Sequence, residues 1–237
     1  MAPAQVLDAA KGVYVVYSFP VDFSRTERAE LTDLFDELGP DAPTLCEGWR
    51  THDLAAHLWI RETDPLAAPG LLAKPLAGLT ERRLAETRSR WDYATLVNRI
   101  RTGPAKLSMF ALPGVDEEAN TAEYFVHHED VRRANGHGPR QLPSDVADWF
   151  WRRLRLLGRA LFRRVDIGVV LERNDSAARG TSAEDTIRAS VGNPIVTIVG
   201  HPSEITLYGF GRRDAADVRL IGEPDALETL ARASFGL

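Results

Sequence analysis

The segment from Asn120 to Gly136, NTAEYFVHHEDVRRANG, restricts the folds open to this chain because it has charged and histidine side chains inside an apolar helix face. At about 100° per residue, Glu123, His127 and Asp130 fall on one line along the helix, whereas His128 points to another side. Apolar residues flank this line on both sides. An ionised carboxylate buried without a partner costs several kcal/mol, so such groups are paired or bind a metal. The fold must therefore bring a partner to this face.

A second helix, predicted from Thr51 to about Arg61, repeats the pattern with His57 at the centre of its apolar face. One histidine from this helix and a glutamate and histidine four residues apart on the other would supply two nitrogen ligands and one oxygen ligand. That set, His57, Glu123 and His127, is typical of a protein metal site.

Two further carboxylates lie close to the histidines in the sequence. Asp53 comes one turn before His57, and Asp130 comes three residues after His127. Both are placed to orient an imidazole from behind or to relay a proton.

Each of these residues also has an interpretation that needs no metal. Glu123 follows Asn120 at the spacing of a capping box. Asp130 could form an ion pair with Arg133, Asp53 could form one with an arginine on its own helix, and a single inward histidine is commonly a satisfied core residue. The spacing alone leaves these alternatives open.

Helical patterns dominate the chain as far as Val165. A β-rich run ends at Pro20, and Ser24 with Glu27 then has the spacing of a capping box, which predicts that a helix begins there. Thr51 is the expected cap of the next helix. The other helices are expected at about Thr80–Arg101 with a break near Arg90, at Asn120–Asn135 and at Ser144–Val165. The Pro- and Gly-rich stretch after Arg61 is expected to be a loop.

The pattern changes at Asp166. Four short β-rich runs follow, GVVLER, DTIRAS, IVTIVG and DVRLIG, with short helices expected over SEITLYGFG and PDALETLARASF. We therefore expect an N-terminal extension over residues 1–22, an all-α domain over 23–165 and a small α+β domain over 166–237.

Composition narrows the classes of partner. The net charge of −5 provides no overall basic field for nucleic acid or an anionic membrane, although Arg152, Arg153 and Arg155 form a local cluster. The apolar run Val13–Phe19 is far shorter than the ~20 residues of a membrane span and lacks the features of a signal peptide. The single cysteine, Cys46, rules out an internal disulfide and is expected to be a small buried residue. We expect a cytoplasmic protein with no nucleic-acid or membrane partner, and the oligomeric state is left open.

Three segments carry a resemblance to a known family. LCEGWRTHDLAAHL, NTAEYFVHHEDVRRA and VTIVGHPSEITLYGFGRRDAADVRLIGEPDALETL resemble, in that order, the actinobacterial mycothiol-dependent maleylpyruvate isomerase-like proteins, a branch of the DinB-like metal-binding superfamily. The resemblance runs from about Phe23 to the C-terminus. It implies an N-terminal DinB-like four-helix bundle that holds a divalent metal, usually zinc, and a small sterol-carrier-like α+β domain.

The same resemblance implies roles for individual residues. His57, Glu123 and His127 match the metal ligands of the family. Arg212 matches an arginine that the second domain is taken to contribute to the active site, and Arg213 beside it is the alternative.

The chemistry implied is that of a thiol. Zinc held by two neutral imidazoles and one carboxylate keeps a net charge of about +1 and an open fourth position. A thiol that enters this position loses its proton. The resemblance therefore implies an enzyme that uses mycothiol to attack the electrophilic carbon of a small substrate, as an isomerase or an S-transferase.

Other functions remain open at this point. The same ligands also serve zinc hydrolases and iron oxygenases, and a hydrolase would need Asp53, Asp130 or Glu62 as its base. The remaining alternative is a non-catalytic protein that binds a metal or another ligand.

Overall fold

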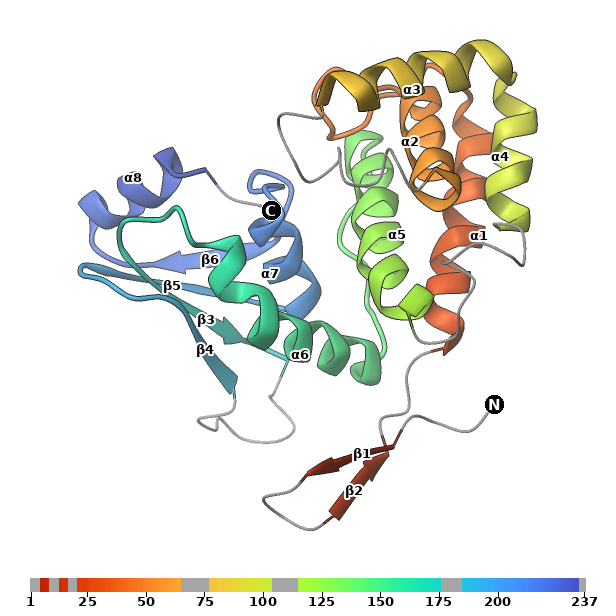
Figure 1. The fold of residues 1–237 in the computed structure, drawn as a ribbon. Coiled ribbons are helices and arrows are strands. Elements are labelled where there is room, and N and C mark those ends of the chain that lie inside the picture. Colours follow the sequence, from red (N-terminus) through yellow and green to blue (C-terminus); the bar gives the residue numbers. More distant parts are fainter. Residues whose placement is uncertain are drawn as a thin grey trace. The chain divides into compact units, whose positions relative to one another are not determined.

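The computed structural model of the chain describes residues 5–8, 13–16, 21–64, 77–103, 115–175 and 185–234 (Figure 1). It divides into two compact units, Met1–His137 and Gly138–Leu237. The first unit contains the strands β1 (Gln5–Asp8) and β2 (Val13–Val16) and the helices α1 (Val21–Leu38), α2 (Thr51–Thr63), α3 (Ala77–Arg90), α4 (Tyr93–Thr102) and α5 (Val115–Ala134). The second contains α6 (Ser144–Leu161), β3 (Gly168–Arg173), β4 (Thr186–Ser190), β5 (Ile195–Gly200), α7 (Pro202–Gly209), β6 (Val218–Ile221) and α8 (Pro224–Arg232).

The first unit is built around an apolar core between its helices. Helix α1 packs against α4 and α5, and α2 packs against α3 and α4. Leu31 and Phe35 of α1 are fully buried in this core together with Leu54 of α2 and Tyr124 of α5. In Figure 1, α3 crosses one end of the group formed by the other helices. The break expected near Arg90 separates α3 from α4.

Three helices begin differently from the sequence prediction. Helix α1 begins at Val21, so Ser24 is already helical, and Glu27 is fully buried instead of capping the end. Helix α5 begins at Val115, so Asn120 lies within the helix and does not cap it for Glu123.

The start of α2 was also mispredicted. Its N-cap is Arg50, whose backbone N–H donates to Asp53 Oδ2 at 2.9 Å, and the Thr51 hydroxyl donates instead to the carbonyl of Gly39. A cap is chosen by the backbone angles at the turn, which residue spacing does not specify.

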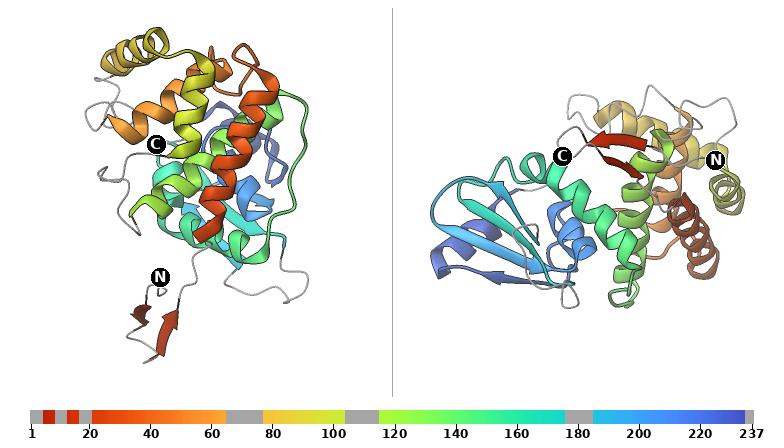
Figure 2. Two further views of the ribbon diagram at one scale, coloured as in Figure 1. Left: turned by 90° about the vertical axis from the view of Figure 1, so that its right-hand side faces the viewer. Right: turned by 90° about the horizontal axis from the view of Figure 1, so that it is seen from below.

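The second unit has a four-stranded sheet in the order β4-β3-β5-β6, with β3 parallel to β5 and the other pairs antiparallel. All four strands lie where the β-rich runs predicted them. Figure 2 shows the sheet and its helices from two further directions. Val169 and Leu171 of β3 and Val196 and Ile198 of β5 are fully buried. Because side chains two residues apart on a strand point to the same face, these four belong to the face that the core covers.

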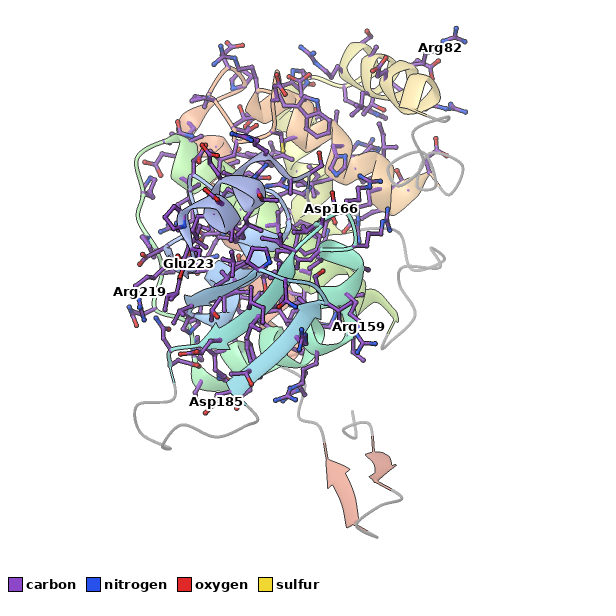
Figure 3. The ribbon with its side chains drawn as sticks, turned by 90° about the vertical axis from the view of Figure 1, so that its left-hand side faces the viewer. Arg82, Arg159, Asp166, Asp185, Arg219 and Glu223 are labelled. Atoms are coloured by element: carbon purple, nitrogen blue, oxygen red, sulfur yellow. The ribbon has the colours of Figure 1, made fainter. Side chains whose placement is uncertain are left out.

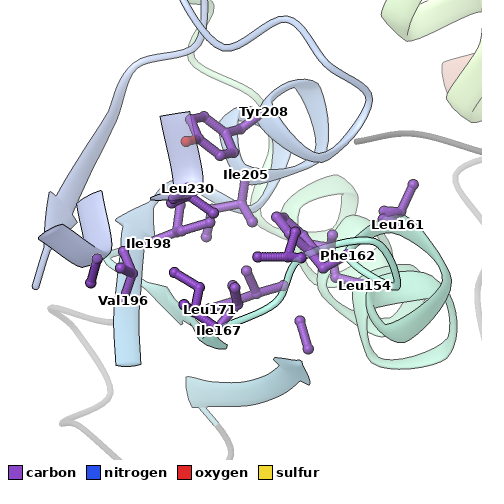
Figure 4. Packing of buried hydrophobic residues seen from close by; sticks show 14 of the residues in the cluster. Leu154, Leu161, Phe162, Ile167, Leu171, Val196, Ile198, Ile205, Tyr208 and Leu230 are labelled. Carbon is purple, nitrogen blue, oxygen red and sulfur yellow. The ribbon is translucent and has the colours of Figure 1, made fainter. Parts of the chain in front are cut away.

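Helix α6 belongs to the second unit, whereas residues 144–165 were predicted from the sequence to belong to the helical domain. The reason is its apolar face. Trp151, Leu154 and Leu161 of α6 lie in one buried cluster with Leu171 of β3 and Ile198 of β5, and α7 and α8 add residues such as Ile205 and Leu230 (Figure 4). A helix joins the unit that buries its apolar stripe. The other face of α6 is mostly charged, with Arg159 exposed on it (Figure 3), although Leu156 is exposed there too.

Residues 1–22 contain an antiparallel pair, in which β1 is bonded to β2 with Val6 opposite Val15. Their assignment as an N-terminal extension stays a prediction. Within the described part of the chain, none of the helices has the length and apolar character needed to cross a membrane.

Candidate metal centre

Three side chains with metal-ligand atoms meet where α2 and α5 face each other. Nε2 of His57 lies 3.2 Å from Oε1 of Glu123, and Nε2 of His127 lies 3.3 Å from the same oxygen. One ligand atom from each residue lies within 4.8 Å of the other two. The two histidine side chains are 8% and 9% exposed and that of Glu123 is 28% exposed. Solvent therefore reaches the group mainly at the carboxylate.

Local helix geometry accounts for much of this arrangement. Glu123 and His127 are four residues apart on α5, which places both side chains on one face. His57 reaches this face from α2, and its ring stands edge to face with that of His127, with the ring centroids 4.9 Å apart. The structure thus brings together the three residues that the sequence singled out. Their role as metal ligands stays a prediction.

Asp130 supports His127 from the other side of the ring. Its Oδ2 lies 2.9 Å from Nδ1 of His127, and the Asp130 side chain is fully buried. Because the carboxylate can only accept, Nδ1 carries the hydrogen and Nε2 of a neutral ring keeps its lone pair for a ligand bond. Arg133, the partner considered for Asp130 from the sequence, donates its Nε to Glu129 at 2.6 Å.

The pKa values of the three groups are strongly coupled. Burial acts to raise the pKa of Glu123, but hydrogen bonds from His127 and His57 outweigh it and hold the pKa well below its usual range. Burial acts to lower the pKa of His127, yet hydrogen bonds with Asp130, Cys46 and Glu123 raise it well above its usual value. Burial lowers the pKa of His57, against the opposing hydrogen bond with Glu123. The directions of these shifts favour an ionised Glu123, a protonated His127 and a neutral His57.

A divalent metal fits this donor set, and zinc fits it well. Two ligands at about 2.0–2.1 Å from a shared tetrahedral zinc are about 3.3 Å apart. Oε1 of Glu123 has this separation from both Nε2 atoms. When Nδ1 of His127 donates to Asp130, the lone pair of Nε2 in a neutral ring faces an anionic oxygen, which is repulsive. A proton or a metal cation removes this repulsion.

Asp53 does not form the expected contact with His57. Its Oδ2 accepts the backbone N–H of Arg50, and its Oδ1 accepts from Arg88 of α3 at 2.6 Å. Nδ1 of His57 is buried and has no hydrogen-bond partner among the described residues. Asp53 lies in the first turn of α2, where a carboxylate is drawn to the free backbone N–H groups. A catalytic role for Asp53 stays a prediction.

His128 lies apart from the three-residue group, on another face of α5, as the helix periodicity predicted. Its Nδ1 is 3.0 Å from Oε2 of Glu27 of α1, and both side chains are buried. This contact explains why Glu27 turns inward instead of capping α1. Glu27, Glu30 and His128 have ligand atoms within 4.8 Å of one another, although Glu30 is exposed.

Arg212 follows α7 in the second unit. Its backbone N–H donates to the carbonyl of Leu207 at 3.0 Å, and its Nη1 donates to the carbonyl of Phe210 at 2.7 Å. Arg213 instead donates to the carbonyls of Leu230 and Ala231 of α8. Arg213 therefore fastens the end of α8, which leaves Arg212 as the better candidate for the role implied by the resemblance.

Three neighbours of this group were not predicted from the sequence. Nε of Arg61 lies 3.3 Å from Oε1 of Glu123, the Trp49 ring lies 5.0 Å from that of His57 between centroids, and Cys46 contacts Asp130. A signal existed for Arg61, which is four residues after His57 and so shares its helix face. Trp49 and Cys46 come from an irregular loop, where no periodicity predicts the direction of a side chain.

Comparison with known proteins supports the fold. No protein-family model matches the chain, and no curated protein matches it either. A crystal structure of the mycothiol-dependent maleylpyruvate isomerase matches with a TM-score of 0.54 and 15% identity, over 84% of this chain and 90% of that chain. The structure of a histidine-to-alanine mutant of that isomerase matches at 14% identity over the same shares, with a TM-score of 0.48.

The expected resemblance is thus confirmed at the level of the fold, which is a helical part followed by helices around a small sheet. At this identity, the likeness shows the fold alone. The DinB-like four-helix bundle and the sterol-carrier-like character of the second domain stay predictions.

Proposed function

We propose that this protein, which shares its fold with a mycothiol-dependent isomerase, is a metal-dependent enzyme that uses a low-molecular-weight thiol to attack an electrophilic carbon. The observation that carries the proposal is the convergence of His57, Glu123 and His127 at ligand distances, with Asp130 behind His127. Mycothiol is the proposed thiol. Isomerisation and S-transfer are the two outcomes open to such an attack.

The proposed roles of the residues follow from their contacts. His57, Glu123 and His127 would hold the metal, and a bound divalent cation, zinc by its donor set, would lower the pKa of a thiol that enters its open position. Asp130 holds the hydrogen on Nδ1 of His127 and so keeps Nε2 available. Hydrogen bonds from His127 and His57 lower the pKa of Glu123 against the effect of burial, and the positive charge of Arg61 beside it adds to this, so the carboxylate stays ionised.

The hydrolase alternative is weakened by the positions of the three carboxylates that it requires as a base. Glu62 accepts from Arg28 and from the Tyr124 hydroxyl. Asp53 accepts from Arg88, and Asp130 faces His127 and Cys46. Each carboxylate is already engaged by a hydrogen-bond or ion-pair partner within the fold, and the proposed base would have to give up that contact to take a proton from a water. A thiol needs no such base, because its own proton is easily lost.

The test of this proposal is thiol binding to the cobalt-substituted protein. If cobalt replaces the native metal, mycothiol should add a sulfur-to-metal charge-transfer band in the near ultraviolet and release about one proton per site at neutral pH. The band should persist in Cys46→Ala, because the sulfur comes from the added thiol.

Two results would contradict the proposal. Hydrolysis of an ester or amide without thiol, with no change in the cobalt spectrum, would favour the hydrolase. A metal that only raises the melting temperature, with neither effect, would favour the non-catalytic alternative.

A role for Arg212 in binding is a separate part of the proposal. A guanidinium suits a carboxylate because it can donate two parallel hydrogen bonds. We predict that Arg212→Lys raises the concentration of thiol or substrate needed for half-maximal rate by roughly tenfold, the loss of about one charge-assisted hydrogen bond. Metal content and the unfolding midpoint should not change. Steady-state kinetics on the purified variant measures the effect. An unchanged half-saturating concentration of thiol and of substrate would show that Arg212 does not bind either molecule.

A further inference from the structure

The loop before α2, residues 43–50, is held in one conformation by its own hydrogen bonds. Thr44 Oγ1 donates to the carbonyl of Trp49 at 3.0 Å and accepts the backbone N–H of Cys46 at 3.2 Å, while the N–H of Trp49 donates to the carbonyl of Cys46. Gly48 completes the turn with a φ of 76°, a conformation that other residues rarely adopt. The loop is also tied to α5, because the N–H of Leu45 donates to the backbone carbonyl of Asp130 at 3.1 Å.

This loop contacts both histidines of the candidate metal centre. On one side, the Trp49 ring lies against the ring of His57. On the other side, the Cys46 thiol reaches the carboxylate behind His127. Sγ of Cys46 donates to Oδ2 of Asp130 at 3.2 Å, and the same oxygen faces Nδ1 of His127 at 2.9 Å. Sγ itself is 3.9 Å from that Nδ1.

We propose that Cys46 is a positioning residue that acts on His127 through Asp130. The inference rests on the proposed metal centre. Asp130 is fully buried, and its Oδ2 accepts from two donors, one from the loop and one from the imidazole. The thiol hydrogen therefore restricts the rotation of the carboxylate and keeps Oδ2 in line with the imidazole. A misplaced carboxylate would let the ring turn and would move Nε2 away from its position beside Glu123.

Direct metal ligation by Cys46 is the competing interpretation. Cys46, His127 and Asp130 also have ligand atoms within 4.8 Å of one another. In that arrangement the metal would bind Nδ1 of His127, and the Nε2 that faces Glu123 would carry the hydrogen. The positioning role requires the opposite, with hydrogen on Nδ1 and the lone pair on Nε2. The two interpretations therefore differ in the tautomer of His127 and in the presence of sulfur at the metal.

The experiment compares Cys46→Ala with Cys46→Ser and uses Leu45→Ala as the control from the same loop. A serine hydroxyl can donate to Asp130, whereas alanine cannot. Removing a group that orients a metal ligand typically lowers metal affinity 10- to 100-fold, so this more distant contact should be worth roughly fivefold in Cys46→Ala. Cys46→Ser and Leu45→Ala should stay within about twofold of the wild-type value. Competition with a chelator measures cobalt and zinc affinity without any added thiol.

A second readout separates positioning from folding. Nitrogen-15 NMR of the histidine rings reports which nitrogen of His127 carries hydrogen, and the Nδ1–H signal should shift in Cys46→Ala but not in Cys46→Ser. The inference would be overturned if Cys46→Ala had the same metal affinity and the same histidine spectrum as the wild-type protein. An equal loss of metal affinity in Cys46→Ala and Cys46→Ser would also overturn it, because the sulfur atom, and not the hydrogen bond to Asp130, would then be what matters. A thiolate band in cobalt protein without added thiol would establish ligation by Cys46.

The proposed function and the positioning role of Cys46 can be refuted independently of each other. Normal metal binding with the expected difference between the two Cys46 variants, but no response to mycothiol, would refute the thiol enzyme and retain the positioning role. A wild-type protein that binds no metal would refute both.

Discussion

Replacing His57 or His127 with alanine should leave the protein with about a tenth or less of the metal held by the wild-type chain, which we expect to be about one ion per chain. Each substitution removes one of the three proposed ligands and leaves Glu123 without one of its two imidazole partners. Asp130→Asn should have a smaller effect, roughly 10- to 100-fold in affinity, because it changes only the group that orients His127. Elemental analysis after dialysis, followed by a chelator titration, measures both effects.

His128→Gln is the matched control for these variants. The residue is next to His127 in the sequence, but its ring contacts Glu27, and a glutamine amide can still donate to that buried carboxylate. Its metal content should equal that of the wild type. Full retention of metal in His57→Ala, or loss in His128→Gln, would show that the ligands are assigned wrongly.

Arg28→Met should destabilise the protein by about 3–5 kcal/mol, the typical cost of removing one partner from a buried ion pair. Arg28 of α1 donates to both oxygens of Glu62 of α2 and to the carbonyl of Ile100 of α4. The hydroxyl of Tyr124 of α5 donates to Glu62 at 2.7 Å, so one network joins four helices. Burial, with the charge of Glu62, raises the pKa of Tyr124 well above its usual value and keeps the hydroxyl protonated as a donor.

The size of the destabilisation expected for Arg28→Met follows from the burial of Glu62. The Glu62 side chain is 1% exposed, so the substitution leaves an ionised carboxylate without its cation in a site that water scarcely reaches. Denaturant unfolding followed by circular dichroism measures the loss. The double variant Arg28→Met/Glu62→Gln should recover at least about half of it, because the neutral amide still accepts from Tyr124.

Arg101 provides the surface control for this experiment. It bridges Asp33 and Asp36 of α1 at 2.8 Å to each, but the three side chains are 34%, 74% and 51% exposed. Arg101→Met should therefore cost only about 0–1 kcal/mol. A loss below about 1 kcal/mol for Arg28→Met as well would mean that the buried network contributes little to stability.

Sequence periodicity was sufficient to locate the strands of the sheet and the inward faces of α2 and α5, but not the residues at which α1, α2 and α5 begin. The strands of the sheet and the break between α3 and α4 lie where the residue pattern placed them. Glu123, His127 and Asp130 also meet as predicted, because residues three and four apart on a helix are always neighbours. Such local relations depend only on the backbone geometry of one helix. They are therefore readable without knowledge of the rest of the fold.

Relations between distant segments depended on packing. Glu62 was considered as a catalytic base, but the approach of α1 and α5 makes it the centre of a buried ion pair. Asp53 was expected to orient His57, but α3 brings Arg88 to it. Cys46 is 84 residues from Asp130 in the chain, and the folded loop brings their side chains together. The physical reason is that partners of a buried polar group are set by how elements pack, and helix period carries no information on the register between two helices.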